Sequence, residues 1–385
     1  MPRAAVCNAI DTPLEIVDLE LQAPKANEVK VRLGASGVCH SDLSVRNGTL
    51  LAPLPAVLGH EGAGVIEEVG EGVEHLQPGD HVVISWIPQC RDCYFCQGGQ
   101  GHLCDVGLPT IATGSLLDGT PRFVRDGQPL LQMSASGTFT ESTVVPAMSA
   151  VKIDKDIPLA SAALIGCGVL TGFGAAHNTA DIRQGDTVAV VGCGGVGLNV
   201  IQGAKHSGAE RIIAIDMVDG KLQTAQKFGA TDLVNAREDD SIAKVMELTD
   251  QRGADVAFEV IGLQATIDQA FTMTRRGGQT VLVGVPAMDV MMTVPVGLGL
   301  IFSEKQIRGC LYGSSNVHHD IPMLADLYTE GKLMLDELVS HEITLDGVNT
   351  AMDEMSSGEV TRSVIVFDEP AGDRAAGTNA SATTG

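Results

Sequence analysis

The segment "TVAVVGCGGVGLNVIQGAKHSGAERIIAID", residues 187–216, decides how the central part of this chain folds. An apolar, β-branched run leads into G-x-G-x-x-G, which is followed by a helix-length segment and a second apolar run. Gly192 permits a tight turn, Gly194 lets a pyrophosphate approach the backbone, and Gly197 lets helix and strand pack closely. The pattern therefore predicts a strand–turn–helix–strand unit that binds a dinucleotide at the positive N-terminus of the helix.

The acidic residue that ends the second run, Asp216, indicates which dinucleotide is bound. Its carboxylate can accept hydrogen bonds from both ribose hydroxyls but would repel a 2′-phosphate. No arginine follows it in "DMVDGK", so the sequence favours NAD over NADP. A flavin or another adenine nucleotide is the alternative ligand, and an Asp216 that merely caps the next helix is the structural alternative.

The pattern of apolar runs differs between regions of the chain and divides it into parts. Short strand-like segments punctuated by glycine and proline, such as "EVKVRLGASGV" and "GDHVVISWI", predict an antiparallel β-rich first third. Further along, six apolar runs alternate with helix-length segments and predict a doubly wound parallel sheet: "TVAVV", "RIIAI", "DLV", "DVAFEV", "QTVLVGV" and "QIRGCLY". After Tyr312 we expect a helix in "DIPMLADLYTEGKL" and a strand in "TRSVIVF" that return to the first domain.

Composition limits the partners of this protein. Lys and Arg number 25 against 48 Asp and Glu, which gives a formal net charge of −23. Such a surface repels phosphate backbones and anionic lipids, so neither nucleic acid nor a membrane is an expected partner. The N-terminus has no apolar segment long enough for a signal peptide. We therefore expect a cytoplasmic protein whose nine cysteines are ligands or buried thiols.

Four of those cysteines lie in "CRDCYFCQGGQGHLC", residues 90–104, with the spacing C-x2-C-x2-C-x7-C. A disulfide framework is disfavoured by the expected compartment. Four thiolates from a short glycine-rich loop suit a closed tetrahedral zinc site, although an iron–sulfur cluster uses similar spacing. The candidate ligands are Cys90, Cys93, Cys96 and Cys104.

Three further soft ligands lie far apart in the sequence. The sequence pattern predicts a glycine-flanked turn around each of them: Cys39 in "GVCHSD", His60 in "LGHEGAGVIEEVG" and Cys167 in "LIGCGVLTGFG". Two thiolates and one imidazole suit Zn²⁺ with a fourth position open for water or substrate. Taken singly, each residue also fits a buried core position.

Together these motifs resemble the zinc-dependent medium-chain alcohol dehydrogenases, in their long-loop, two-zinc, NAD-dependent branch, over residues 1–368. The resemblance implies an α/β protein in which a GroES-like β-rich catalytic domain is interrupted by a Rossmann coenzyme domain. The implied boundaries are 1–168 for the first catalytic part, 169–311 for the coenzyme domain and 312–368 for the return, with 369–385 as a disordered tail. A homodimer or another homo-oligomer is also implied.

The resemblance further assigns the metal sites. It implies that Cys39, His60 and Cys167 bind a catalytic zinc, with Glu61 able to approach the metal, and that the lobe at 90–104 binds a structural zinc. Asp42 matches the carboxylate that orients the histidine ligand, and Ser41 matches the hydroxyl that accepts the alcohol proton. Many relatives pass that proton to a histidine three residues later; this chain has Ser44 there, so its relay is expected to end differently.

The coenzyme contacts implied by the resemblance involve several elements. His40 and Arg362 match basic residues near the pyrophosphate, Lys221 matches one near the adenosine ribose, and Thr171 lies beside the nicotinamide. Val283 and Val285 resemble backbone contacts to the carboxamide. The full implied set also includes the loop residues Gly192, Gly194, Gly195, Val196, Gly197 and Asp216.

The expected reaction is reversible oxidation of a primary alcohol to the aldehyde, with hydride transfer to NAD. Trp86, Leu50, Leu108 and Met133 indicate an apolar pocket for an aliphatic, aryl or terpene-like alcohol. Leu50 and Leu108 match positions where glutathione-dependent formaldehyde dehydrogenases carry charged residues, which disfavours glutathione chemistry. Four alternatives stay open: a dehydrogenase for another thiol adduct, a nicotinoprotein with tightly bound NAD and an external acceptor, a zinc-free reductase, and a non-catalytic NAD-binding scaffold.

Overall fold

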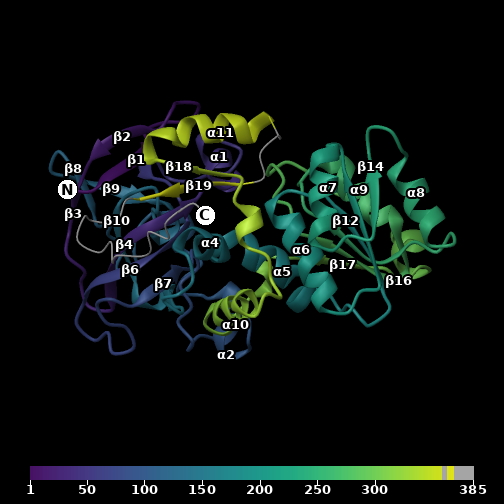
Figure 1. Cartoon of the computed structure of the whole chain (residues 1–385), viewed down its shortest axis with the longest axis horizontal. Coiled ribbons are helices and arrows are strands. Elements are labelled where there is room, and N and C mark those ends of the chain that lie inside the picture. Colours follow the sequence, from purple (N-terminus) through teal and green to yellow (C-terminus); the bar gives the residue numbers. More distant parts are fainter. Residues whose placement is uncertain (358–361, 368–385) are drawn as a thin grey trace, which may run out of the picture.

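The computed structural model describes residues 1–357 and 362–367. It has two lobes, one built mainly from the first third of the chain and the other from its centre (Figure 1). The tail predicted at 369–385 lies outside the described residues.

The central lobe contains the parallel sheet that the six apolar runs predict. Its strand order is β14-β13-β12-β15-β16-β17, and every neighbouring pair is parallel. The first strand, β12, lies between β13 and β15, so the order of the strands reverses beside it. Ligands of such sheets bind at the carboxyl end of the strands at this reversal. That is where the glycine loop begins, directly after Val191.

The helices of this lobe cover the sheet (Figure 1). Runs of Val, Ile and Ala form the strands because both faces of the sheet are buried. The element bounds are β12 Thr187–Val191, α6 Gly195–His206, β13 Arg211–Asp216, α7 Asp219–Phe228, β14 Asp232–Asn235, α8 Ser241–Leu248, β15 Ala254–Glu259, α9 Gln264–Met273, β16 Thr274–Leu282 and β17 Gln306–Gly309.

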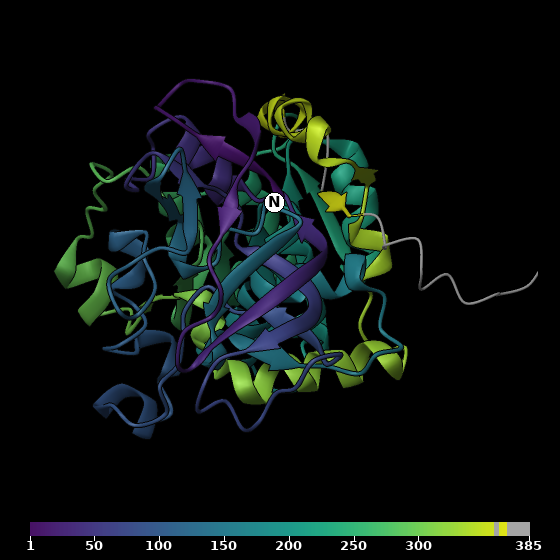
Figure 2. The same cartoon turned by 90° about the vertical axis from the view of Figure 1, so that its left-hand side faces the viewer.

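The other lobe is built from two further sheets (Figure 2). One has the order β2-β1-β5-β9-β8-β3, and the other has the order β11-β7-β6-β4-β19-β18, with β10 also paired to β4. The bounds are β1 Arg3–Cys7, β2 Glu15–Asp18, β3 Glu20–Leu21, β4 Glu28–Gly37, α1 His40–Arg46, β5 Ala56–Val57, β6 Glu61–Val69, β7 His81–Ile84, α2 Tyr94–Gln97, α3 Thr110–Thr113, β8 Phe123–Arg125, β9 Gln128–Gln132, β10 Ser142–Pro146 and β11 Ala150–Lys152.

The chain returns to this lobe after the parallel sheet, as the sequence predicts. The predicted helix forms α10, Val317–Thr329, and the predicted strand "TRSVIVF" forms β19, Ser363–Val366. β19 pairs antiparallel with β4, so that Val364 lies opposite Gly37. The returning part also contains β18 His341–Ile343 and α11 Val348–Ser357.

A helical segment, Leu159–Thr179, which we call the joining helix, leads from the β-rich lobe to the parallel sheet. It consists of α4 Leu159–Leu164 and α5 Leu170–Gly174, each followed by a π-helical segment, Ile165–Val169 and Ala175–Thr179. Its length and hydropathy would allow it to cross a membrane, but 83% of its apolar window is buried inside the protein. We therefore assign this segment as a buried core helix. The boundary predicted between residues 168 and 169 falls inside it and stays a prediction.

Glycines let this segment pack closely on α6. A Cβ on Gly172 would lie 2.2 Å from the carbonyl oxygen of Val196, and one on Gly203 would lie 2.6 Å from that of Phe173. Both distances are shorter than non-bonded contact allows, so only glycine fits at these two positions. The close approach fixes the start of α6 against the segment that carries Cys167.

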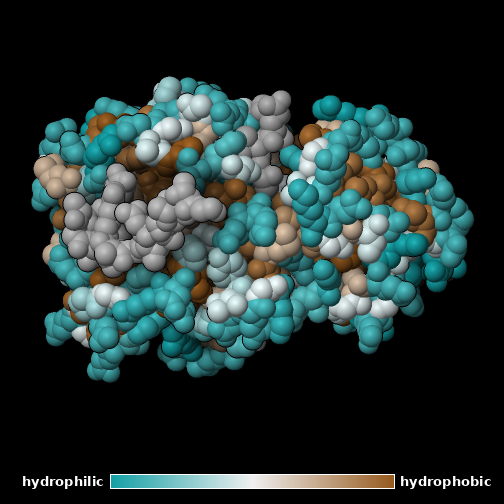
Figure 3. Space-filling model, in the orientation of Figure 1, coloured by the Kyte–Doolittle hydropathy of each residue, from teal (hydrophilic) through white to brown (hydrophobic). Residues whose placement is uncertain are grey.

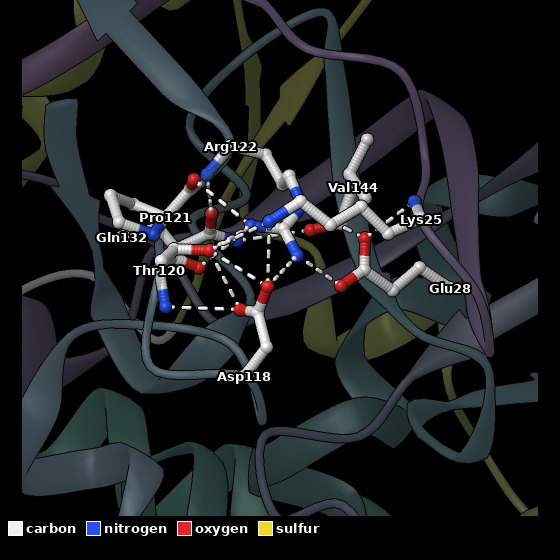
Figure 4. Close-up of polar contacts among 8 residues, drawn as sticks. All are labelled: Lys25, Glu28, Asp118, Thr120, Pro121, Arg122, Gln132 and Val144. Carbon is white, nitrogen blue, oxygen red and sulfur yellow. Dashed lines mark hydrogen bonds and ion pairs between the residues drawn. The ribbon is translucent and has the colours of Figure 1, made fainter.

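The visible surface is mostly hydrophilic (Figure 3), as the net charge leads one to expect. Two arginines nevertheless lie in the interior, Arg122 in the β-rich lobe and Arg362 beside the site described below. Arg122 is fully buried, and its guanidinium makes a two-pronged contact with Glu28 and a hydrogen bond of 2.9 Å to Asp118 (Figure 4). Its Nη1 also donates to Thr120, so the buried charge is both paired and hydrogen-bonded.

We expect Glu28→Gln to lower the free energy of unfolding by about 3 kcal/mol, because it leaves the buried charge of Arg122 without its main counter-ion. Lys25→Met is the control, since the Lys25–Asp118 pair is largely solvent-exposed and is worth under about 1 kcal/mol. Urea unfolding of the two variants at equal zinc concentration checks the difference. Equal losses would contradict the role given to the buried pair.

Candidate active site

Four buried side chains from three distant segments converge beside the joining helix. Cys39, His60, Glu61 and Cys167 each offer a ligand atom, and these atoms all lie within 4.8 Å of one another. Cys39 directly precedes α1, and His60 directly precedes β6. The sequence pattern suggested a turn for Cys167, and that was wrong: it lies in the π-helical segment Ile165–Val169. Its glycine neighbours are explained by close packing rather than by a turn.

Asp42 holds two of these ligands in place. Its fully buried carboxylate accepts hydrogen bonds from the backbone N–H of Cys39 at 2.9 Å and of Gly59 at 3.1 Å. One oxygen also lies 3.1 Å from Nδ1 of His60. If Nδ1 carries the proton, Nε2 is left with a free lone pair, as a metal ligand requires.

Glu61 connects the set to Arg362. Its Oε1 accepts a hydrogen bond from Gly168 N and lies 3.2 Å from the Arg362 guanidinium, whereas Oε2 is buried and has no hydrogen-bond partner among the described residues. Burial raises the pKa of Glu61 to about 8, although the charge of Arg362 opposes the shift. A buried, unpartnered carboxylate oxygen beside two sulfurs and an imidazole fits a bound metal cation.

The two thiols of the set differ in their electrostatics. A hydrogen bond from Cys167, together with the positive charge of Arg362, holds the pKa of Cys39 well below its usual value, against the effect of burial. The same hydrogen bond and burial raise the pKa of Cys167. Cys39 is therefore the more readily formed thiolate, and the thiolate is the form that binds zinc.

The dinucleotide loop lies at the carboxyl end of β12. Gly192 has φ +102°, and a Cβ on Gly197 would lie 1.9 Å from the Gly192 carbonyl oxygen. A Cβ on Gly194 would meet no atom within 4 Å, so its surface is open to a ligand. The Asp216 carboxylate accepts hydrogen bonds from the N–H of Cys193 at 2.8 Å and of Val218 at 3.1 Å. Asp216 thus fixes the loop as well as the turn before α7.

Arg362 brings the ligand set and the loop together. It is 6% exposed, and Cβ atoms on Gly168 and Gly195 would come within 2.1 and 2.5 Å of its guanidinium. It therefore packs on both the Cys167 segment and the first turn of α6. Desolvation and the charges of Arg362 and Lys221 lower the pKa of His40, whereas the charge of Cys39 opposes the shift.

The residues predicted for the proton relay and for the nicotinamide side differ in their contacts and burial. Ser41 Oγ lies 3.8 Å from the Cys39 sulfur, and the Ser44 carbonyl accepts a hydrogen bond from Leu50 N. Thr171 lies in α5 beside the Gly172 contact with Val196. Val283 is buried and donates its N–H to the Glu259 carbonyl at 2.8 Å, whereas Val285 is 65% exposed.

The four predicted pocket residues do not form one cluster. Trp86 lies edge-on to His60, with ring centroids 6.3 Å apart, and packs in the same core cluster as Leu108. Leu50 and Met133 pack in another cluster, together with Leu58. Because Leu58 is two residues before His60, both clusters border the same segment.

The sequence pattern missed two buried polar residues near the site. Tyr312 donates a hydrogen bond to the carbonyl of Gly166, next to Cys167. Glu259 accepts hydrogen bonds from the N–H of Ile261 and Gly262 at the carboxyl edge of the parallel sheet. They lie in the runs "QIRGCLY" and "DVAFEV", which predict only strands, so the fold alone shows that both residues lie near the site.

The cysteine lobe forms a second candidate metal site. The four sulfurs lie within 4.8 Å of one another, and the Cys90–Cys96 and Cys93–Cys104 pairs are both 3.9 Å apart. Zn–S bonds of about 2.3 Å in a tetrahedron place sulfurs about 3.8 Å apart, whereas a disulfide requires about 2.05 Å. Backbone hydrogen bonds, first from Cys96, lower the pKa of Cys93 to about 6 and favour its thiolate.

Comparisons with known proteins agree with this geometry. Residues 25–155 match the family model for the alcohol dehydrogenase GroES-like domain, and residues 195–330 match that for zinc-binding dehydrogenases. The NDMA-dependent alcohol dehydrogenase of Amycolatopsis methanolica is 42% identical over 367 residues, covering 94% of this chain and 98% of that protein. The S-(hydroxymethyl)glutathione dehydrogenase of Paracoccus denitrificans is 38% identical over 375 residues, covering 95% and 99%.

A solved structure extends the comparison to three dimensions. Benzyl alcohol dehydrogenase from Acinetobacter calcoaceticus superimposes with a TM-score of 0.90 at 32% identity, covering 95% of this chain and 99% of that one. The fold predicted from the sequence, a GroES-like domain with a parallel-sheet coenzyme domain, is confirmed.

We expect Cys93→Ala to lower the zinc bound per chain by one equivalent and to make the 90–104 lobe sensitive to protease, because three thiolates no longer close a tetrahedral site. Cys7→Ala is the control: Cys7 is buried outside both ligand sets, so its loss should leave the metal content unchanged. Metal analysis and limited proteolysis measure the two effects. Unchanged zinc in Cys93→Ala would refute the lobe as a metal site.

Proposed function

Because this chain belongs to the zinc-dependent medium-chain alcohol dehydrogenase family, we propose that it oxidises a primary alcohol to the aldehyde, reversibly, with NAD as the hydride acceptor. One observation carries the proposal. Arg362 contacts both Glu61, in the buried ligand set, and Gly195, in the first turn of α6. A metal held by the set and a dinucleotide held by the loop would therefore be separated by a single side chain.

Cys39, His60 and Cys167 would hold a zinc ion, with Glu61 as a further ligand. When bound, such an ion supplies a Lewis acid that lowers the pKa of an alcohol hydroxyl. The residues around the ion would position its ligands and exclude water. Asp42 keeps the His60 ring in one orientation, and the burial of all four ligand side chains keeps water away from them.

The proton of the alcohol needs an acceptor close to the ligand set. Ser41 is suited to this because its hydroxyl lies 3.8 Å from the Cys39 sulfur and can both accept and donate a proton. Ser44 cannot store a proton at neutral pH as a histidine could. We therefore propose that Ser41 passes the proton to water or to a coenzyme hydroxyl.

The coenzyme would occupy the loop between β12 and α6, and when bound it supplies the hydride acceptor. The first turn of α6 and Arg362 would provide positive potential for the pyrophosphate, and His40 is a proposed hydrogen-bond contact to it, since its lowered pKa favours the neutral ring. Lys221 and Asp216 are the proposed contacts for the adenosine ribose. Thr171, Val283 and Val285 are the proposed contacts on the nicotinamide side.

The proposed substrate is an aliphatic, aryl or terpene-like primary alcohol. Trp86 beside His60, together with Leu50, Leu108 and Met133, offers apolar surface and no charged group for a carboxylate. The likeness to a benzyl alcohol dehydrogenase supports an aryl substrate. The likeness to an S-(hydroxymethyl)glutathione dehydrogenase supports the thiol-adduct alternative, against which Leu50 and Leu108 weigh.

A second candidate concerns the fate of the coenzyme. The relative from Amycolatopsis methanolica is named NDMA-dependent, which favours an enzyme whose final acceptor differs from free NAD. In that case this chain is a nicotinoprotein: it retains NAD and returns the hydride to an external acceptor.

We expect the purified protein to contain two zinc ions per chain and to oxidise benzyl alcohol with added NAD. Cys39→Ser should lower kcat/KM by about 10³-fold or more, because it removes a ligand of the group that acidifies the alcohol. The matched control is Cys7→Ala. Turnover that survives Cys39→Ser, or zinc at only one equivalent, would contradict the assignment. Retained NAD with activity on an artificial acceptor alone would favour the nicotinoprotein.

We also propose that the chain forms a homodimer. Apolar side chains between Val285 and Phe302 are 59–78% exposed at seven positions: Val285, Met288, Met291, Val296, Leu298, Ile301 and Phe302. Beside them, β17 pairs only with β16 among the described strands and forms the edge of the parallel sheet. An exposed apolar segment next to an open sheet edge favours association with a second copy.

Leu298→Asp combined with Phe302→Asp should convert the dimer to a monomer, because it places two charges in the apolar segment. Ile10→Asp, which changes an exposed apolar residue in the other lobe, is the control and should leave the mass unchanged. Light scattering after size-exclusion chromatography measures both. A parent protein that is monomeric would refute the proposal.

A further inference from the structure

Tyr312 lies between the coenzyme sheet and the metal-ligand set. It follows β17 in the segment where the chain leaves the parallel sheet, and it is only 2% exposed. It ends the run "QIRGCLY", which predicts only a strand, and the reaction proposed above does not use it. Its side chain nevertheless contacts two of the segments that build the site.

The Tyr312 hydroxyl joins two segments that bear site residues. It donates a hydrogen bond to the carbonyl oxygen of Gly166, the residue before Cys167, and it lies 3.3 Å from Oγ of Ser85, the residue before Trp86. Ser85 in turn donates to the carbonyl of Ile87 at 2.9 Å. A single buried hydroxyl thus fixes the backbone on either side of the site.

The Tyr312 ring supports Trp86 directly. The two ring centroids are 4.6 Å apart with an interplanar angle of 49°, and Trp86 lies edge-on to His60 at 6.3 Å and 85°. The Nε1 of Trp86 is buried and has no hydrogen-bond partner among the described residues. Ring packing, rather than a hydrogen bond of its own, therefore holds Trp86 against the histidine ligand.

The backbone of this segment is in an unfavourable conformation. Tyr312, Gly313 and Ser314 have φ of 53°, 65° and 49°, which is left-handed space that bulky residues rarely occupy. Neighbouring contacts maintain it: Asn178 donates to the Gly313 carbonyl at 3.2 Å, and Thr179 lies 2.7 Å from Ser314 Oγ. Such strain is concentrated at functional sites, where the surroundings over-determine the conformation.

We propose that Tyr312 is a positioning residue that sets the place of Trp86, and with it the size of alcohol accepted, and that holds the Gly166 carbonyl next to Cys167. The part that concerns alcohol size rests on the proposed function. The placement of Trp86 and of the Cys167 segment rests on the contacts alone.

Two substitutions separate the contributions of ring and hydroxyl. Tyr312→Leu removes both, and Tyr312→Phe keeps the ring. Tyr328→Phe is the matched control, because it also removes a tyrosine hydroxyl that is hydrogen-bonded, here to Asp336 on the surface. Circular dichroism and thermal melting establish that each variant folds.

The single tryptophan of the chain, Trp86, allows a measurement that needs no substrate. Tyr312→Leu should shift its emission maximum and increase its quenching by acrylamide, whereas Tyr312→Phe and Tyr328→Phe should leave both unchanged. The Tyr312 hydroxyl donates a hydrogen bond to the carbonyl of Gly166, next to Cys167. Tyr312→Phe should therefore shift the thiolate absorption of the cobalt-substituted protein. Tyr328→Phe should not.

Kinetics test the effect on alcohol size. In Tyr312→Leu, the kcat/KM ratio of cinnamyl alcohol to ethanol should rise about tenfold, because Trp86 can move into the vacated space. If this variant keeps the parent's Trp86 emission, quenching and ratio, the proposal is overturned. If the parent oxidises no alcohol but Trp86 emission and cobalt absorption respond as stated, the proposed function fails while the positioning role of Tyr312 is supported.

Discussion

The buried ion pair between Arg362 and Glu61 is the constraint on which the arrangement of the site depends. Two thiols, a carboxylate and an imidazole are buried within one small volume, and uncompensated charge there would be costly. Arg362 supplies one positive charge from the segment that returns to the first lobe. A divalent ion would offset two more of the negative charges that the two thiolates, Glu61 and the neighbouring Asp42 can carry. The same guanidinium packs on the start of α6, so charge balance at the ligand set also orders the coenzyme loop.

The joining helix makes this arrangement rigid. It carries Cys167 in a π-helical segment, and its glycines bring the backbone of α6 close enough that a single methyl group would not fit. The ligand and the dinucleotide loop are therefore fixed relative to each other by backbone contact as well as by the arginine. The strained residues after β17 add a third connection, through Tyr312 and Trp86.

The features that the sequence predicted best are local in origin. The six parallel strands follow from runs of β-branched residues, and the loop after β12 follows from glycines that each meet a distinct steric demand. The cysteine lobe follows from spacing alone. In contrast, Cys167 was expected in a turn, because glycines in a sequence do not reveal whether they serve a turn or a close helix contact. The burial of Arg122 and the contacts of Tyr312 depend on residues far away in the chain, which no local pattern contains.

The pairing of β19 with β4 has a consequence for the order in which the protein is made. Residues 35–37 pair with residues 61–63 on one side, but their strand partners on the other side are residues 364–366, whereas every strand of the parallel sheet pairs within residues 187–309. The ribosome thus releases a complete coenzyme sheet well before the first lobe can close. Arg362 lies in the same late segment, so the ligand set has its counter-charge only after residue 362 has been synthesised. The nascent chain therefore passes through a period in which its cysteines are present but the pocket that would select their metal is not.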